Sequence, residues 1–421
     1  MSPSLALACA GILGVGLMGP AHASPRAKPA PHKAAPTATA PAPTPAPAPQ
    51  KQSGSAELRL IEIYKLIGAG QTRDALNKAQ ALVNDVPHFH LAQLVYADLL
   101  VARTSKLSAM GAAPSDLSAM APQRLAQLKT EAERRLAALK ERPPAGALPA
   151  QFIELPPSTR HAIAVDATRS RLYLFENGPK GMQLVADHYA SVGRLGIEKS
   201  TEGDQRTPLG VYYITSRLDG HQLTDFYGSG ALLLNYPNEY DRRQGRTGGG
   251  IWLHGVPSDS YARSPNSTDG CVALANPELR TILERVQPRS TPVVIARSLQ
   301  WVQPGNAETD RRSVHNLIEG WRMARASGDV NRLMAFYSPQ FASGAYDFSQ
   351  WRAALTKEVG QQKTRSFQLK DLSILGWKDK SDLLVVTFGE VADGQRTGSV
   401  KRQYWGKEGG LWKIFYEGVI G

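Results

Sequence analysis

The sequence is poor in cysteine and lacks the short motifs that bind metals or nucleic acids. Only two cysteines, Cys9 and Cys271, occur in 421 residues, which excludes a framework of disulfides. There is no H-x-x-x-H or C-x-x-C pair of the kind that holds zinc. No basic helix or aromatic-basic motif suits nucleic acid either. We therefore expect no cofactor, no metal and no nucleic-acid partner.

Positive charge, in contrast, is abundant. The chain has 49 Lys and Arg against 37 Asp and Glu, a net charge of +12. This excess suits an acidic polymer, whether nucleic acid, anionic lipid or cell wall, and charge alone does not choose among them. The length predicts two or three folded units.

The N-terminal residues predict export to the periplasm or cell envelope. Residues 4–19 are apolar and small, and Ala21-His22-Ala23 provides an A-x-A cleavage site, so residues 1–23 are interpreted as a signal peptide. Retention of the segment would instead attach the protein to a membrane. Cleavage would remove Cys9 and leave Cys271 as a single thiol in an oxidising compartment. Such a thiol is either inert and buried or a nucleophile.

The rest of the chain predicts an α+β multidomain protein. Residues 24–54 are rich in Pro and Ala and form a linker. Residues 55–142 have apolar positions every three to four residues and resemble a tetratricopeptide-like helical cap, a possible docking module for a protein partner. Residues 155–297 alternate as strands of a mainly antiparallel β domain. Residues 308–421 begin with helices and continue as a meander of strands, an α+β arrangement.

The segment GIWLHGVPSDSYARSPNSTDGCVALANPEL contains the pattern with the clearest chemistry. A strand ends at His254-Gly255, and 17 residues later a Ser-Thr-Asp-Gly-Cys turn presents Cys271. A thiol needs a neighbouring base to become a nucleophile at neutral pH, and a histidine provides one. Gly270 would let a substrate carbonyl approach, and backbone N–H groups of Gly270 and Cys271 would hold the oxyanion. Asp269 either orients His254 or caps the turn.

This pattern resembles the L,D-transpeptidase catalytic (YkuD-like) family. The segments VDATRSRLYLF and SVGRLGIEKSTEGDQRTPLGVYYI, upstream, are similar to the opening hairpin and the Thr-Pro-x-Gly-x-Tyr run of that family. The resemblance implies that Cys271 is the nucleophile, that His254 is the general base and acid, and that the Gly255 carbonyl orients the imidazole. Many relatives have His or Arg at the position of Asp269, and Arg at the position of Ala273. These two differences leave the acyl donor and the acyl acceptor open.

The resemblance also implies a substrate, the stem peptides of peptidoglycan. Cys271 would attack the carbonyl of the third stem residue, release the terminal D-amino acid and form a thioester. Attack on the thioester by an amine of a second stem gives a 3,3 cross-link. Attack by water makes the enzyme an L,D-carboxypeptidase that trims tetrapeptides to tripeptides.

The C-terminal residues resemble the nuclear-transport-factor-like cone, with a WxxA pattern at residues 321–324 and FYS at residues 336–338. A transpeptidase-like domain followed by such a cone resembles the arrangement in cell-shape-determining L,D-carboxypeptidases. The concave pocket of the cone would bind glycan, and candidate lining residues or, alternatively, sheet core are Trp351, Tyr404, Trp405 and Trp412.

Two other hypotheses remain open on the sequence. A zinc site would use His254, Asp259, Asp269 and Cys271. A wall-binding scaffold without enzymatic activity would carry an inert thiol, and it would keep its function after alkylation. Weaker candidates for substrate contact, chosen because they lie near the catalytic strands in sequence, are Tyr236, Asn238, Trp252, Arg263 and Ser267.

Overall fold

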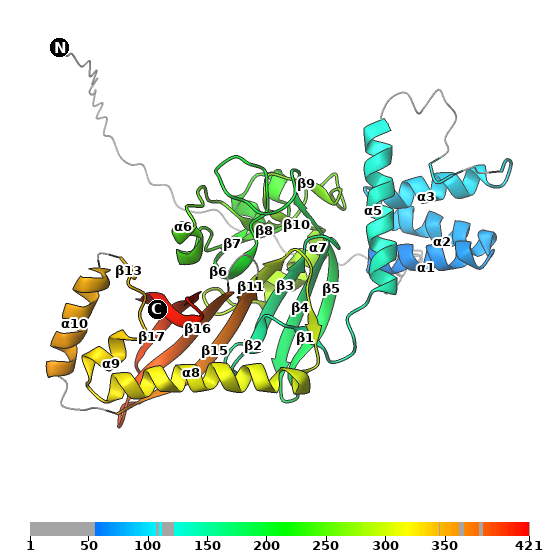
Figure 1. Cartoon of the computed structure of the whole chain (residues 1–421). Helices are drawn as coiled ribbons and strands as arrows, with labels where there is room; N and C mark the ends of the chain where they lie inside the picture. Colours follow the sequence, from blue (N-terminus) through cyan, green and yellow to red (C-terminus); the bar gives the residue numbers. More distant parts are fainter. Residues whose placement is uncertain are drawn as a thin grey trace, which may run out of the picture. The chain divides into compact units, whose positions relative to one another are not determined.

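A computed structural model describes most of the chain after residue 54. The described residues are 55–106, 109–111, 122–344, 346–361, 366–378 and 382–420 (Figure 1). The expected signal peptide and linker lie outside them. Within the described residues, no helix is both long and apolar enough to cross a membrane.

The N-terminal described region is helical, as predicted. Its helices are α1 (Ala56–Gly68), α2 (Thr72–Asp85), α3 (His90–Val101) and α5 (Pro122–Lys140). The side chain of Ser55 caps α1 by accepting a hydrogen bond from the Leu58 amide. The apolar stripes of these helices form one core, which also includes Tyr261 from the following domain. Whether the helices are a tetratricopeptide unit stays a prediction.

Buried ion pairs fasten this helical region to the next domain. The guanidinium of Arg135 on α5 contacts Glu57 of α1 and Glu131, each at 2.7 Å. Glu57 also contacts Arg171 at 2.8 Å, and Arg171 lies on β4 (Arg171–Gly178) and pairs with Asp187 at 2.6 Å. All but Asp187 are buried. Because such charges are costly to bury without partners, the network holds α1 and α5 in place.

The central domain is a mixed β-sheet of nine strands. Its remaining strands are β3 (His161–Asp166), β5 (Gly181–Gly193), β6 (Gly210–Asp219), β7 (Gly230–Leu234), β8 (Trp252–His254), β9 (Asn266–Thr268), β10 (Val272–Leu274) and β11 (Pro292–Ala296). The order is β10-β8-β7-β6-β11-β3-β4-β5-β9, and β10 also pairs with β5, which closes the sheet on itself. Most pairs are antiparallel, as predicted, and the parallel ones are β10 with β8, β11 with β3, and β5 with β9.

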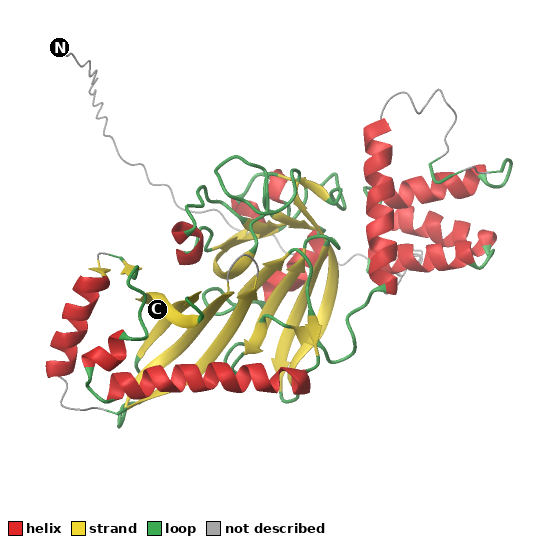
Figure 2. Cartoon of the chain, viewed as in Figure 1, coloured by secondary structure: helices red, strands yellow, loops and turns green. Residues whose placement is uncertain are grey.

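Short helical segments connect these strands. They are η1 (Gly220–Gln222), η2 (Asp225–Tyr227), α6 (Glu239–Arg243) and α7 (Asn276–Arg285). Figure 2 shows the change from the purely helical region to this strand-rich domain. Consecutive apolar residues of β3, β4, β6 and β11 are buried on both faces of the sheet and form its core.

The C-terminal domain packs helices on a curved antiparallel sheet. Its elements are η3 (Pro304–Ala307), α8 (Glu308–Ala326), α9 (Val330–Met334), β13 (Ala342–Ser343), β14 (Tyr346–Asp347), α10 (Phe348–Gln361), β15 (Phe367–Lys378), β16 (Asp382–Ala392), β17 (Ser399–Glu408) and β18 (Leu411–Val419). The buried face of α8, with Ile318 and Trp321, packs on apolar residues of β15 to β18 (Figure 1). The predicted order of helices followed by strands is therefore confirmed.

Two short strands outside the main runs tie the domains together. β2 (Phe152–Glu154), which precedes the catalytic domain in sequence, is the edge strand next to β15 in the C-terminal sheet. β1 (Leu148–Pro149) pairs with β12 (Trp301–Val302). The start of the catalytic domain at residue 155 stays a prediction. The strand just before it, β2, belongs to the sheet of the C-terminal domain.

The structure decides between the two interpretations of the aromatic residues of the cone. Tyr404 is 2% exposed and Trp405 is fully buried, so neither side chain can form a glycan-binding face. They point to opposite faces of the sheet, Tyr404 into the core shared with the catalytic domain and Trp405 into the core beneath α8. Trp351 and Trp412 are half-buried, and the ring of Trp351 stacks on Phe341 with 5.2 Å between centroids. Sheet core was the alternative interpretation, and it holds for Tyr404 and Trp405.

Candidate active site

His254 is the last residue of β8, and its orientation is set by its own neighbour. The ring nitrogen Nδ1 lies 2.7 Å from the carbonyl oxygen of Gly255, and the side chain is 1% exposed. A carbonyl oxygen only accepts, so Nδ1 must carry the proton and donate it. In the neutral ring Nε2 then holds the lone pair. His254 is thus held in the tautomer that can take a proton at Nε2.

The loop after His254 is clamped by Asn276, the first residue of α7. Its Oδ1 accepts from the amides of Ser229 (2.9 Å) and Val256 (3.2 Å), and its Nδ2 donates to the Val256 carbonyl (2.8 Å). A Cβ on Gly255 would lie 2.1 Å from Asn276 Oδ1. Close packing against Asn276 therefore requires glycine at position 255 and fixes the carbonyl that orients His254.

Cys271 lies in the turn between β9 and β10, beside the strand that carries His254. In the parallel β8–β10 pair, Val272 is opposite Leu253 and Ala273 is opposite His254. Cys271 therefore lies one residue before the segment of β10 that pairs with β8, the strand that ends at His254. Its Sγ donates to the Gly250 carbonyl at 3.3 Å. The fold thus brings together two residues that are 17 positions apart in sequence.

Gly270 is required for a reason other than the one expected. Its φ is +124°, and a Cβ there would lie 2.7 Å from the Arg206 carbonyl oxygen and 3.2 Å from Ile251 Cδ1. The position is closely packed, not open for a substrate. Its N–H donates to Thr268 Oγ1 at 3.2 Å, and its carbonyl accepts from Thr207 Oγ1 at 2.9 Å. Use of the Gly270 N–H as an oxyanion donor would require the bond to Thr268 to be given up.

Burial keeps both members of the pair uncharged. It lowers the pKa of His254 to about 4, with a further lowering by Arg263 and an opposing effect of the Gly255 hydrogen bond. Burial raises the pKa of the Cys271 thiol to about 11; Asp269 adds to the rise, while a Trp252 backbone hydrogen bond and Arg263 oppose it. At neutral pH the pair is therefore a thiol beside a neutral imidazole, and proton transfer has to accompany attack on a substrate.

This protonation state predicts slow alkylation of Cys271 in the free protein. With a pKa of about 11, only about 10⁻⁴ of the thiol is ionised at pH 7, and the rate with iodoacetamide should rise about tenfold per pH unit from 7 to 10. Intact mass spectrometry of a protein that starts at residue 24 measures this rate on its single thiol. A plateau below pH 8 would show a stabilised thiolate and contradict the prediction.

Aromatic rings surround the histidine. The ring of Phe226 is nearly parallel to the imidazole of His254 at 6.0 Å, and Tyr227 meets it edge-on at 5.2 Å. Trp252 packs on Tyr227 at 4.8 Å. The guanidinium of Arg263 lies 4.2 Å above the Phe226 ring, and its Nη2 donates to the Phe226 carbonyl at 3.3 Å. Of the weaker candidates, Trp252 and Arg263 are thus in contact with the residues around His254.

Tyr236 and Asn238 are occupied inside the fold. Tyr236 is 6% exposed and its hydroxyl donates to the Thr247 carbonyl at 3.2 Å. Asn238 is 4% exposed, and it forms a capping box with Asp241 at the start of α6. Both residues are near the catalytic strands in sequence, but their side chains are buried. These contacts argue against direct substrate binding by either residue.

Ser267 and Asp269 precede Cys271, Ser267 on β9 and Asp269 in the turn itself. Ser267 Oγ donates to the Ser264 carbonyl at 3.0 Å and is half-buried. Asp269 is exposed and forms an ion pair with Arg194 at 2.9 Å. The imidazole of His254 is hydrogen-bonded to the carbonyl of Gly255. This bond orients the ring without a contribution from Asp269. Among the described residues, no group of three or more His, Cys, Asp or Glu side chains is arranged to hold a metal ion.

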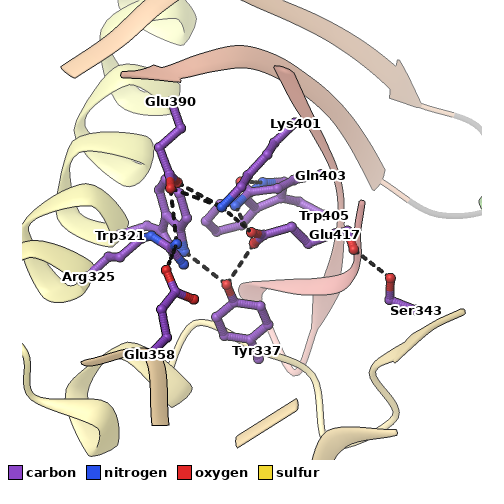
Figure 3. Close-up of polar contacts among 10 residues, drawn as sticks. All are labelled: Trp321, Arg325, Tyr337, Ser343, Glu358, Glu390, Lys401, Gln403, Trp405 and Glu417. Atoms are coloured by element: carbon purple, nitrogen blue, oxygen red, sulfur yellow. Dashed lines mark hydrogen bonds and ion pairs between the residues drawn. The ribbon is translucent and has the colours of Figure 1, made fainter. Parts of the chain in front are cut away.

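A second polar cluster lies in the C-terminal domain (Figure 3). Arg325 pairs with Glu358 at 2.8 Å and Glu390 at 3.1 Å, and Lys401 contacts Glu390 at 3.0 Å. Glu417 is buried and accepts at 2.7 Å from the Tyr337 hydroxyl, which completes the group. A cavity of about 200 Å³ opens beside it and is lined by Arg325, Glu358 and Glu390.

Comparison with known proteins places both domains in families. Residues 160–295 match the L,D-transpeptidase catalytic domain (YkuD), and residues 313–418 match the Cds6 C-terminal NTF2-like domain. The chain therefore contains an L,D-transpeptidase (YkuD) catalytic domain followed by a C-terminal NTF2-like domain. No significant match was found among curated proteins.

Two solved structures are similar to a little under two thirds of the chain. Bd1075 of Bdellovibrio bacteriovorus is 25% identical, with a TM-score of 0.56, over 65% of this chain and 98% of that one. The helical cell shape determining protein Pgp2 of Campylobacter jejuni is 23% identical, with a TM-score of 0.49, over 61% of this chain and 91% of that one. The similarity to Bd1075 supports the fold of the paired domains.

Several residues that hold the site had no role in the sequence analysis. Thr207, in the Thr-Pro-x-Gly run, accepts from the Gly193 amide and donates to the Gly270 carbonyl, so this motif supports the turn that carries Cys271. Lys199 is buried and pairs with Asp204 at 2.8 Å. Asn276 clamps the His254 loop. Thr207 and Lys199 belong to the segment SVGRLGIEKSTEGDQRTPLGVYYI, whose resemblance to the family could have pointed to them. No local sequence pattern indicates the role of Asn276.

Proposed function

We propose that the protein is a cysteine-dependent enzyme of peptidoglycan remodelling that acts on stem peptides. Cys271 attacks the carbonyl of the third stem residue, and the leaving D-amino acid departs as the thioester forms. His254 takes the thiol proton at Nε2 and returns it to the leaving amine. The observation that carries this proposal is the Gly255-held tautomer of His254 beside the strand of Cys271.

The fate of the thioester decides the reaction class. Transfer to an amine of a second stem is L,D-transpeptidation, and transfer to water is L,D-carboxypeptidation. The NTF2-like domain favours the second as an alternative, because that pairing resembles tetrapeptide-trimming, cell-shape-determining enzymes. Export to the periplasm, a role in cell shape and glycan binding in the cavity beside Arg325 and Glu390 belong to the same proposal. A protein partner on the helical region and a non-enzymatic scaffold remain the other hypotheses.

The test is incubation of purified protein with disaccharide tetrapeptides, followed by mass spectrometry of the muropeptides. Tripeptide without dimers would identify a carboxypeptidase, and 3,3-linked dimers would identify a transpeptidase. The Cys271→Ala protein is the blank for both products. Absence of any product that depends on Cys271 would overturn the enzymatic proposal and support the scaffold.

A further inference from the structure

A groove of about 310 Å³ extends from the catalytic domain to the helical region. His90 of α3 and Arg124 and Gln127 of α5 line one side. Phe226, Arg263 and Ser267 line the other side. The family-like match begins at residue 160, so one wall of this groove comes from a part of the chain outside the catalytic domain.

The groove lies next to the residues around His254, and Phe226 of its lining connects the two. Phe226 is the shared element: one neighbour of its ring is the imidazole of His254, at 6.0 Å, and another is the guanidinium of Arg263, at 4.2 Å. Ser267 lies four residues before Cys271 in the turn that presents the thiol. A peptide bound with its reacting carbonyl at Cys271 can therefore extend along this groove, past Phe226 and toward α5.

The wall formed by the helical region is held firmly. Arg135, about one helical turn beyond Glu131, the last groove residue of α5, is locked by Glu57 and Glu131. The ring of Phe89, just before α3, packs on Tyr261 at 4.3 Å, and the Tyr261 amide donates to the His88 carbonyl at 3.1 Å. The side chains on α3 and α5 are thus preorganised against the catalytic domain, which reduces the ordering cost of binding.

The unpaired charges of the groove are positive. Arg124 has His90 Nδ1 as its polar neighbour at 3.2 Å, and Arg263 has the Phe226 carbonyl at 3.3 Å. Neither guanidinium forms an ion pair with a carboxylate within the part of the chain that the structure describes. Glu131 also lines the groove, but its Oε1 is taken by Arg135. Burial lowers the pKa of Arg263, and the charges of Asp269 and Cys271 oppose this lowering only in part.

We propose that this groove is a subsite for a carboxylate of the stem peptide, recognised by Arg124 of the helical region together with Arg263. Guanidinium groups bind carboxylates through paired hydrogen bonds, and stem peptides carry carboxylates near the bond that is cut. The inference rests on the proposed function and assigns the helical region a part in substrate selection.

The experiment uses the exposed residue Arg124, so that the catalytic pair stays intact. Binding to the Cys271→Ala protein is measured by calorimetry with two probes: disaccharide tetrapeptides with free carboxylates, and the same muropeptides with their side-chain carboxylates amidated. Adding Arg124→Gln should weaken binding of the free acid about fivefold and leave the amidated probe unchanged. The difference should shrink at 0.5 M salt, and Arg124→Lys should restore part of it.

Lys140→Gln is the matched control. It removes one positive charge from the exposed end of the same helix, about 24 Å from Arg124 at 1.5 Å per residue, and should bind both probes like the parent protein. An equal effect of Arg124→Gln on both probes, or none on either, would overturn the subsite. This outcome is separable from the fate of the proposed function, because Cys271-dependent turnover is measured independently of Arg124.

Discussion

Replacing Cys271 with Ala should lower turnover of disaccharide tetrapeptides by about 10⁴-fold or more, because no other group can form the acyl-enzyme. The thiol is the single nucleophile of the turn between β9 and β10, beside the strand of His254. Release of tripeptide or dimer, quantified by mass spectrometry, measures the loss. Cys271→Ser should be similarly inactive, because a hydroxyl beside an uncharged imidazole is a weaker nucleophile than a thiol.

Two controls make this result specific. Wild-type protein treated with iodoacetamide at high pH should lose the same activity, which would not follow if the thiol were an inert core residue. Treatment with a chelator should leave wild-type turnover unchanged, whereas loss would support the zinc hypothesis. Undiminished turnover by Cys271→Ala would refute the thioester mechanism.

Replacing Arg135 with Met should loosen the helical region. The change keeps a long apolar stem but leaves Glu131 without its cation, while Glu57 retains Arg171 at 2.8 Å. Removing one member of a buried ion pair costs about 3 kcal/mol or more. Hydrogen exchange of α1 and α5 should therefore accelerate about 10²-fold, provided that local opening governs the exchange.

The pH dependence and a second substitution test the cause. Burial raises the pKa of Glu131 above its ordinary 4.5, so the unpaired carboxyl can bind a proton as the pH falls, and the defect should be smaller at acid pH than at pH 8. Adding Glu131→Leu should recover part of the protection. Lys140→Met, on the same helix but exposed, should change exchange little. Unaltered protection in Arg135→Met would show that the ion pairs do not anchor the helices.

The sequence predicted the elements well where one physical signal dominates. Apolar periodicity located the helices from 56 to 140 and the strands from 161, and these are local patterns. The Cys271 and His254 pair was found because its residue types carry the chemistry. Asn276 was missed, since an Asn at the start of a helix looks like an ordinary cap, and only the folded chain shows its contacts with Ser229 and Val256.

Features that depend on distant segments were beyond the sequence. Gly270 was singled out for substrate approach, but its close neighbour Arg206 is 64 positions away, so the packing that requires a glycine was visible only in three dimensions. Tyr404 and Trp405 looked available because aromatic residues suit both sugar binding and sheet cores. The wall of the groove at Arg124 depends on how the helical region meets the catalytic domain, which no periodicity encodes.

The position of β2 has a consequence for synthesis of the chain. This strand leaves the ribosome before the catalytic domain, but its partner β15 begins about 210 residues later. At roughly 5–20 residues per second, β2 waits about 10–40 s for the strand that it pairs with. Pairing of β2 with β15 is therefore possible only after the whole catalytic domain has been synthesised.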